Sequence, residues 1–355
     1  MTIKNRGALS NPVGRFEIHD YEAYDDGWHL TEEEAPLAPL ATVLYPEQTK
    51  SIITHNASPD ISFDQSINPY RGCEHGCIYC YARPAHAYIN LSPGIDFETK
   101  IFHKVDAAKR LEEEINKPKY ECKVIVIGAN TDPYQPAEAK LKITQSLLEV
   151  LNRYHHPVAI ITKSGMIERD LDILEAMAKR QLISVAISLT TLRMDLKRIL
   201  EPRASSPQAR LRAIEKLNGV NVPVTVMAAP MIPMINDAEI EKILALAAKR
   251  GAKFAGFTLI RLPHEVKILF KEWLAAHFPD RAEHVMSIIK QMRGGKEYDA
   301  TFGKRMRGEG QFAILLAKRF ALACKRFHLN EQPRMPLDTS QFKPRRKEEA
   351  QMSLW

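Results

Sequence analysis

The sequence predicts an α/β fold in which helices cover a parallel sheet, and two observations carry this prediction. Between residues 61 and 260, short apolar runs rich in Val and Ile recur, and stretches of helical character follow them. Strands that are apolar throughout, instead of alternating with polar residues, are typical of a parallel sheet buried on both faces. Six such strand–helix units are found, without an obvious seventh or eighth, so an incomplete barrel is expected.

The strands and the helices between them can be placed in order along the chain. Strands are predicted at residues 61–69, 124–128, 158–162, 183–188, 222–227 and 254–260. Helices are predicted at residues 106–115, 136–154 and 167–180, in the segment that ends at residue 218, and at residues 237–250. Because the carboxyl ends of the strands of a barrel meet at one rim, the residues that follow each strand are expected to form the active site.

The chain divides into four predicted regions around this barrel. Residues 1–60 are predicted to be an N-terminal extension, since they lack periodicity and are interrupted by proline, with a short strand at residues 15–18. Residues 61–265 are predicted to form the barrel, and residues 266–330 a basic helical C-terminal region. The polar, proline-bearing residues 331–355 are expected to be a mobile tail.

Three of the five cysteines lie within eight positions, as Cys73, Cys77 and Cys80. This spacing is too local for a disulfide framework, because a bridge between Cys77 and Cys80 would close a very small, strained and easily reduced ring. Clustered thiolates more naturally hold a soft metal or an iron–sulfur cluster. Three thiolates on a four-iron cluster leave one iron open to a substrate or cofactor. The alternative is a structural zinc site of the Cys3His kind with His75, although the paired knuckles or downstream histidines that usually complete such a site are missing.

With Tyr79 before the last cysteine, the loop reads Cys-x3-Cys-x-aromatic-Cys, which resembles the signature of the radical S-adenosylmethionine (radical SAM) superfamily. The run Cys-Ile-Tyr-Cys-Tyr-Ala resembles its spore photoproduct lyase-like branch. The resemblance implies that the three cysteines bind a [4Fe–4S] cluster and that the amino and carboxylate groups of S-adenosylmethionine (SAM) chelate the fourth iron. It implies an enzyme that cleaves SAM to methionine and a 5′-deoxyadenosyl radical for hydrogen abstraction, with an electron donor such as flavodoxin or ferredoxin. The implied fold is a partial (βα)6 TIM barrel, in agreement with the six units above.

Polar or small residues follow four successive predicted strands. The second strand is followed by Asn, Thr and Asp, the third by a lysine that can neutralise a carboxylate, the fourth by Ser, and the fifth by Met and Ala, which leave room for a nucleoside. By the resemblance, Lys163 and Ser188 hold the methionine carboxylate of SAM, with Thr131 and Tyr81 nearby. The candidate cofactor-binding residues are Tyr79, Tyr81, Asn130, Thr131, Asp132, Lys163, Ser188, Met227 and Ala228. The alternative for each residue alone is a helix cap or a solvated side chain.

Four further residues carry weaker signals. Glu201 and Arg203 follow the fourth strand, and they are predicted either to reach the ribose or the carboxylate of SAM or to form an ordinary surface ion pair. Cys122 and Cys324 are interpreted as small core residues and are not assigned to the cluster.

One position departs from the resemblance. Spore photoproduct lyase has a hydrogen-donating cysteine at the end of its second strand, where this chain has Gly128-Ala129-Asn130 and no thiol. Reversal of a thymine photodimer by that route is therefore not expected, and the resemblance defines the class of chemistry better than the substrate.

The net charge of +7 is spread unevenly along the chain. Residues 1–60 carry 4 basic and 10 acidic side chains, whereas residues 290–328 carry 10 basic and 3 acidic ones. This asymmetry favours an anionic partner for the C-terminal region, and the hypothesis is a nucleic acid bound through residues 290–328. The alternative is a solvated helix face. Glycines beside arginines at residues 293–296 and 303–310 resemble a phosphate-gripping loop, but the spacing is not that of a P-loop.

No apolar run is long enough to span a bilayer, and the first residues lack the apolar region of a signal peptide. The protein is therefore expected in the cytoplasm, without a membrane partner, where reducing conditions keep thiols available to a cluster. Two other classes of function stay open. One is a radical SAM enzyme that acts on a protein or a small metabolite. The other is a nucleic-acid-binding protein in which the cysteine loop is a structural zinc knot.

Overall fold

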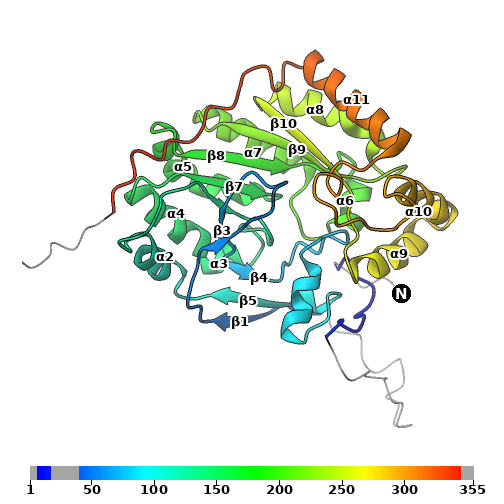
Figure 1. Ribbon diagram of the computed structural model, residues 1–355, viewed down its shortest axis with the longest axis horizontal. Helices are drawn as coiled ribbons and strands as arrows, with labels where there is room; N and C mark the ends of the chain where they lie inside the picture. Colours follow the sequence, from blue (N-terminus) through cyan, green and yellow to red (C-terminus); the bar gives the residue numbers. More distant parts are fainter. Residues whose placement is uncertain (1–5, 17–39, 345–355) are drawn as a thin grey trace, which may run out of the picture.

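A seven-stranded sheet in the order β10-β9-β8-β7-β6-β3-β2 is the centre of the computed structural model, which describes residues 6–16 and 40–344 (Figure 1). Six of its strands run parallel, and the short edge strand β2 (Thr54–His55) pairs antiparallel to β3. The parallel strands are β3 (Gln65–Ile67), β6 (Ile125–Ile127), β7 (Val158–Thr162), β8 (Ile183–Ser188), β9 (Val224–Met231) and β10 (Phe254–Leu259). The predicted α/β fold with six parallel strands is confirmed.

Helices connect successive strands and cover the sheet, as the apolar strands require. They are α2 (Ala107–Ile115), α3 (Glu138–Leu141), α4 (Ile143–Arg153), α5 (Leu171–Ala178), α6 (Met194–Leu200), α7 (Pro207–Gly219) and α8 (Ile240–Lys249), with the 3₁₀ turns η2 (Gly165–Asp170) and η3 (Asp237–Glu239). The start of α7 follows from its sequence, because the Ser206 side chain accepts from the backbone N–H of Ala209 and Pro207 occupies the first turn. The single helix predicted over residues 136–154 is two helices, since Lys142 takes a left-handed backbone with φ of 52°.

A second, three-stranded sheet in the order β1-β5-β4 lies beside the barrel. Its strands are β1 (Val43–Glu47), β4 (Tyr70–Arg71) and β5 (Lys100–Lys104). The 3₁₀ helix η1 (Arg83–Ile89) and the short helix α1 (Asp96–Thr99) complete this part. The second sheet was not predicted. It matters for function because β4 leads directly into the cysteine loop, and β5 pairs with β4 on one side and with β1 on the other.

The C-terminal region is helical; its first two α-helices lie at the carboxyl end of the barrel strands, and its last α-helix packs against α8 (Figure 1). It contains α9 (Val266–His277), the turn η4 (Pro279–Arg281), α10 (Ala282–Gln291) and α11 (Gly310–Arg326). Between α10 and α11, the loop of residues 293–309 returns to the barrel, where the backbone N–H of Leu259 donates to the carbonyl of Met306 at 3.0 Å.

Two local predictions differ from the structure. Arg15 and Phe16 lie in a turn, not in a strand, and the rest of the predicted strand falls outside the described residues. Residues 331–344, expected to be mobile, lie along the barrel (Figure 1), where the Phe342 ring contacts those of Tyr120 and His156 with centroids 5.7 and 5.2 Å away. Aromatic packing holds this part of the chain in place, which composition alone did not indicate.

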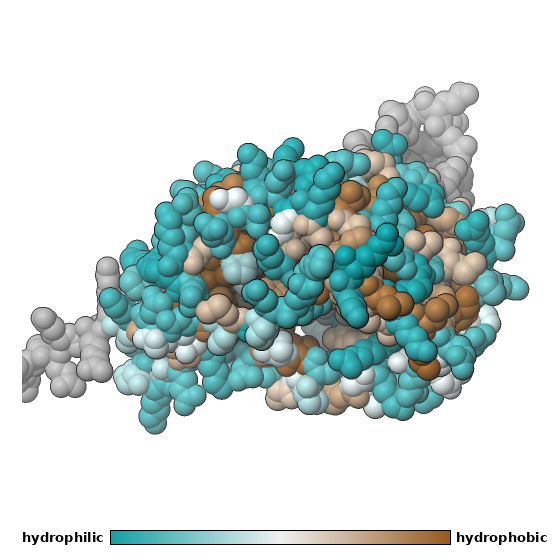
Figure 2. All heavy atoms as spheres, turned by 90° about the horizontal axis from the view of Figure 1, so that it is seen from above, coloured by the Kyte–Doolittle hydropathy of each residue, from teal (hydrophilic) through white to brown (hydrophobic). Residues whose placement is uncertain are grey.

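Hydrophilic side chains cover most of the face on which α8 and α11 lie, and apolar patches are scattered between them (Figure 2). In the part of the chain that the structure describes, no helix is long and apolar enough to cross a membrane.

Candidate active site

The three clustered cysteines lie in one loop between β4 and η1, and none of them forms a disulfide. Backbone bonds fix the loop, as the N–H of Cys73 donates to the carbonyl of Phe97 at 2.9 Å and that of Cys80 donates to the carbonyl of Cys77 at 3.2 Å. Cys73 and Cys77 are buried, while Cys80 is partly exposed. The loop therefore presents three free thiols, the soft ligands that an iron–sulfur cluster takes.

Glycines let this loop wrap closely. Gly72 and Gly76 have positive φ values of 82° and 66°, which only glycine adopts without strain. A Cβ atom on Gly76 would lie 2.7 Å from the carboxylate of Glu98. Gly7 of the N-terminal segment lies against the carbonyl of Gly76, where a Cβ atom would be 1.9 Å from the oxygen. The described part of the N-terminal extension thus covers the cysteine loop.

A buried carboxylate, Glu98, joins three parts of this arrangement. It accepts from the backbone N–H groups of Gly7 at 2.9 Å and Ala8 at 2.8 Å, and it pairs with the Arg83 guanidinium at 2.5 Å. Arg83 also donates to the carbonyl of Cys77 at 2.9 Å. Both charged side chains are fully buried. Sequence reasoning gave Glu98 no role, because the backbone groups that its carboxylate binds are up to 91 positions away.

The surroundings of Cys73 and Cys77 raise the pKa values of their thiols. Burial raises the pKa of Cys77 to about 12, and Glu201 adds to the rise, while Lys163 and Arg210 oppose it. Burial and Asp132 likewise raise the pKa of Cys73. Thiolates become metal ligands only when they lose their protons, so a cationic cluster is the natural counter-charge for this loop. Within residues 6–16 and 40–344, no three His, Cys, Asp or Glu side chains converge closely enough for a single metal ion.

Lys163 follows β7 and faces the cysteine loop, with its Nζ atom 5.9 Å from the centre of the Tyr79 ring. Burial lowers the pKa of Lys163, but Cys77, Glu201 and Asp132 together raise it by more. The pKa of Lys163 is therefore above its ordinary value. The ammonium group stays charged beside the loop, where it can neutralise a ligand carboxylate.

Asp132 ties three rim segments together and does not point into open space. Its carboxylate accepts from the Thr162 hydroxyl at 2.7 Å and from the backbone N–H of Lys163 at 2.7 Å, and it lies 3.4 Å from Nδ1 of His75 in the cysteine loop. Although burial opposes the change, His75 and these hydrogen bonds lower the pKa of Asp132 to about 2. The contacts assign this carboxylate to holding Lys163 and the loop in register.

Glu201 lies in a second buried network and is neither a surface ion pair nor free for a ligand. Its oxygens accept from the hydroxyls of Tyr79 and Thr190, the latter at 2.7 Å, and from the Arg210 guanidinium. Arg210 also donates to the carbonyl of Ser188 at 3.0 Å. Arg210, with Lys163, lowers the pKa of Glu201 to about 2 against the effect of burial. Sequence reasoning missed Arg210, because this residue belongs to no motif.

Other predicted site residues divide into two groups. Ser188 and Met227 are register partners on adjacent strands and share one face of the sheet. Ala228 is the next residue of β9, fully buried on the opposite face, so its side chain does not line the same surface. The Thr131 hydroxyl is used within the protein, as it donates to the carbonyl of Tyr70 at 2.8 Å. Asn130 is exposed.

Tyr81 follows the last cysteine and lies at the open side of the loop. Its hydroxyl donates to the carbonyl of Ala129, and 44% of the residue is exposed. The Arg261 guanidinium lies 4.5 Å from the ring centre. Arg203, predicted with Glu201, instead pairs with Glu74 of the cysteine loop at 2.8 Å.

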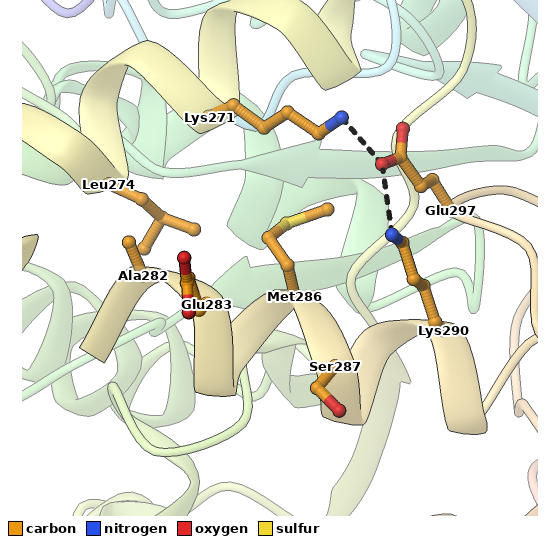
Figure 3. Close-up of a pocket in the computed structure, with 8 residues that line it drawn as sticks. All are labelled: Lys271, Leu274, Ala282, Glu283, Met286, Ser287, Lys290 and Glu297. Carbon is orange, nitrogen blue, oxygen red and sulfur yellow. Dashed lines mark ion pairs between the residues drawn. The ribbon is translucent and has the colours of Figure 1, made fainter.

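Two surface cavities lie apart from the cysteine loop. One of about 420 Å³ lies between α9 and α10, where Lys271 and Lys290 both contact Glu297 at 2.5 and 3.7 Å (Figure 3). Its neighbour, of about 450 Å³, is lined by Leu262, His264, Lys267, Lys296, Glu297 and Tyr298. No residue of the cysteine loop lines either cavity.

Comparison with known proteins gives a family and a fold. The family described as the Radical SAM superfamily matches residues 67–247. An uncharacterized protein of Mycobacterium bovis is 33% identical over 233 residues, 65% of this chain and 68% of the relative. One of Methanocaldococcus jannaschii is 26% identical over 232 residues, 65% of this chain and 82% of the relative.

Solved structures of spore photoproduct lyase have a similar fold. The enzyme complexed with dinucleoside spore photoproduct superposes with a TM-score of 0.58 at 16% identity, over 80% of this chain and 79% of that one. A double mutant with bound AdoMet and dinucleoside spore photoproduct has a TM-score of 0.57 at 17% identity, with the same coverage.

Proposed function

The chain belongs to the radical SAM superfamily, and from this premise we propose that it uses a 5′-deoxyadenosyl radical to abstract hydrogen from a nucleic-acid substrate. It is an enzyme, and its cofactors are a [4Fe–4S] cluster and SAM. When bound, the reduced cluster supplies the electron that cleaves SAM into methionine and the radical. The observation that carries the proposal is the loop of three free thiols with Lys163 beside Tyr79.

Cys73, Cys77 and Cys80 would hold the cluster. The donor set fits it, because three soft thiols lie in one glycine-bearing loop, and Cys80 faces the open side. The buried pair of Arg83 and Glu98 would keep the loop in shape. The contacts of Gly7 and Ala8 with Glu98 would keep water away from one side.

Lys163 would pair with the carboxylate of SAM, and Ser188 and Met227 would lie on the surface that holds the rest of the molecule. Asp132 would position Lys163 through its backbone N–H, and Tyr79 would be oriented by Glu201. In this assignment Thr131, Asp132 and Tyr79 support the binding surface from behind, because their polar atoms already have protein partners. Asn130 and Ala228 are the weakest of the predicted contacts.

A nucleic acid is the proposed substrate for two reasons. The solved structures of similar fold include spore photoproduct lyase complexed with dinucleoside spore photoproduct. The C-terminal region of this chain is also strongly basic, with 10 basic and 3 acidic side chains in residues 290–328. A protein or a small metabolite is the alternative substrate. Gly128-Ala129-Asn130 supplies no thiol after β6, so the hydrogen returned to the product has another source.

We also propose a flavodoxin or ferredoxin as the electron donor and the cytoplasm as the compartment. Both follow from the reduced state that free thiols and a low-potential cluster require.

Anaerobic turnover tests the proposal. Protein reconstituted with iron and sulfide, then given dithionite and SAM, is expected to release 5′-deoxyadenosine. Adding deuterated single-stranded DNA or RNA should then place deuterium in the 5′-deoxyadenosine. Release without deuterium transfer from either polymer would move the substrate to a protein or metabolite, and the absence of 5′-deoxyadenosine would contradict the radical chemistry itself.

A further inference from the structure

Beside the cysteine loop, one arginine is held in position without an acceptor for its charge. Arg261 follows β10 and is half-buried, with its guanidinium 4.5 Å from the centre of the Tyr81 ring. Among residues 6–16 and 40–344, no hydrogen bond or ion pair reaches this guanidinium. An aromatic ring orients an arginine through cation–π attraction and leaves its five N–H donors free.

Half of the ten basic side chains of residues 290–328 already have an acceptor, whereas Arg261 has none among the described residues. Arg293 is buried and donates to the carbonyls of Lys304 at 2.9 Å and Ile260 at 2.8 Å. Lys304 pairs with Glu309 at 2.7 Å, and Arg319 with Glu241 at 2.7 Å. Residues 290–328 are therefore not one free basic surface, which corrects the picture drawn from charge counts.

A second arginine–aromatic pair lies close to the first. Arg305 covers the Phe302 ring at 4.8 Å, and it is anchored by Asp60 and by the Ser58 hydroxyl at 2.7 Å. The Arg293 guanidinium donates to the carbonyls of Ile260 and Lys304, the residues before Arg261 and Arg305, so the two pairs lie close together. Tyr298 lines the cavity that begins at Leu262, next to Arg261. Phe302 is 54% exposed and Tyr81 44% exposed. We name Tyr81, Arg261, Tyr298, Phe302 and Arg305 the arginine–aromatic rim.

The rim continues into a hollow that carries the same charge. The cavity of about 450 Å³ begins at Leu262, next to Arg261, and is lined by Lys267, Lys296 and Tyr298. Its one acidic residue, Glu297, is already paired with Lys271 at 2.5 Å. Unpaired cations and exposed rings thus extend from the cysteine loop outward.

We propose that the arginine–aromatic rim binds a single-stranded or unpaired nucleotide segment of the substrate, with Arg261 on a phosphate and the exposed rings under bases. The inference rests on the nucleic-acid substrate proposed above and names its binding surface. Proteins that hold single strands combine cations that follow the phosphates with aromatic rings on which bases stack. A stacked base requires that the base has left the duplex, so an intact double helix fits this surface poorly. An acidic peptide would use the cations but leave the rings without a function.

Binding of a short fluorescein-labelled oligothymidylate to the SAM-bound holoenzyme tests the rim. The wild type is expected to prefer the single strand to a duplex of equal length. Arg261→Gln should weaken binding roughly 10- to 150-fold, the value of one charged hydrogen bond, and shallow the log–log salt slope by about 0.7. Arg261→Lys should keep the slope and restore only part of the affinity, because lysine lacks the planar fork. Phe302→Leu should weaken binding with the slope unchanged, since stacking releases no counterions.

Arg326→Gln is the matched control, because Arg326 also covers an aromatic ring, Phe327 at 5.5 Å, and is exposed on α11. It should leave oligothymidylate binding unchanged. Equal losses in Arg261→Gln and Arg326→Gln, tighter binding of the duplex, or equal competition by a poly-glutamate peptide would each overturn the rim. SAM cleavage without oligonucleotide binding would overturn the rim and leave the radical chemistry standing. Rim-dependent binding without SAM cleavage would support the rim and contradict the proposed enzyme activity.

Discussion

The cysteine loop and the arginine–aromatic rim lie side by side but treat charge in opposite ways. Around the loop, Glu98 pairs with Arg83 and Glu201 with Arg210, and all four side chains are almost fully buried. At the rim, Arg261 is half-buried and lies over the face of Tyr81, without a hydrogen bond or ion pair to the described residues. Paired buried charges fix a geometry, whereas an oriented but unpaired charge is available to a ligand. The comparison separates residues that fix the geometry of the site from residues whose charge is available to a ligand.

Replacing a residue that fixes the geometry of the site should have the largest effect on stability. In Glu98→Gln, the buried Arg83 loses its counter-charge, and the N-terminal segment keeps weaker acceptors. We expect a loss of about 3–5 kcal/mol in the free energy of unfolding, measured by urea denaturation of the cluster-free protein. Glu113→Gln breaks the exposed pair with Arg110 and should cost at most about 1 kcal/mol. Similar losses in the two variants would show that burial does not distinguish the loop from the surface.

The second-largest effect is expected from acid, which should lower the free energy of unfolding. The pKa of Glu201 and that of Asp132 are both lowered to about 2 from ordinary values of 4.5 and 3.8. A lowered pKa stabilises the fold above the ordinary value, and this stability is lost as the pH falls towards 2. Each carboxyl group adds a slope of about 1.4 kcal/mol per pH unit in that window. Unfolding of the cluster-free protein should therefore show a shallower slope between pH 3.8 and about pH 2 in Asp132→Asn. An identical slope would remove Asp132 from the network.

Lys163 lies between the two classes, since it is positioned by Asp132 and yet carries a charge for a ligand. Lys163→Ala should weaken SAM binding by about 1.5–3 kcal/mol, roughly 10- to 150-fold. Equilibrium dialysis on the iron-loaded protein measures it, with iron content as the control that the loop is intact. An unchanged dissociation constant would take Lys163 out of the SAM site.

The smallest effect is expected where charge is paired at the surface. Lys304→Gln breaks a 2.7 Å contact with Glu309 in which both side chains are half exposed, so the free energy of unfolding should change by less than about 1 kcal/mol. Oligothymidylate affinity should change less than in Arg261→Gln. A larger loss in Lys304→Gln would mean that the exposed basic stretch, not the rim, binds the nucleic acid.

Whether a feature can be predicted from the sequence depends on how far apart its interacting residues lie along the chain. The strands at Val158–Thr162 and Ile183–Ser188 agree with the prediction because apolar runs bounded by polar residues encode them locally. The break at Lys142 was missed, since lysine rarely takes a positive φ. The second sheet was missed because β1 is half exposed and its partner β5 is far along the chain.

The site shows the same limit. The cysteines could be recognised from their spacing, and Lys163 from its place after a predicted strand. The roles of Glu98 and Arg305 depend on partners 91 and 245 positions away, which no local pattern reveals. Charge counting identified residues 290–328 as basic, but it could not tell arginines that already have a partner from those that have none among the described residues.

The most direct test of the central claim is the iron content and SAM cleavage of five single cysteine variants, reconstituted and assayed without oxygen. Cys73→Ala, Cys77→Ala and Cys80→Ala are each expected to lose the cluster and the release of 5′-deoxyadenosine, because each removes one of the three thiolates. Cys122→Ala and Cys324→Ala are expected to keep iron and activity near the wild-type level. Retention of a full cluster in any of the first three, or its loss in Cys122→Ala, would contradict the assignment of the loop.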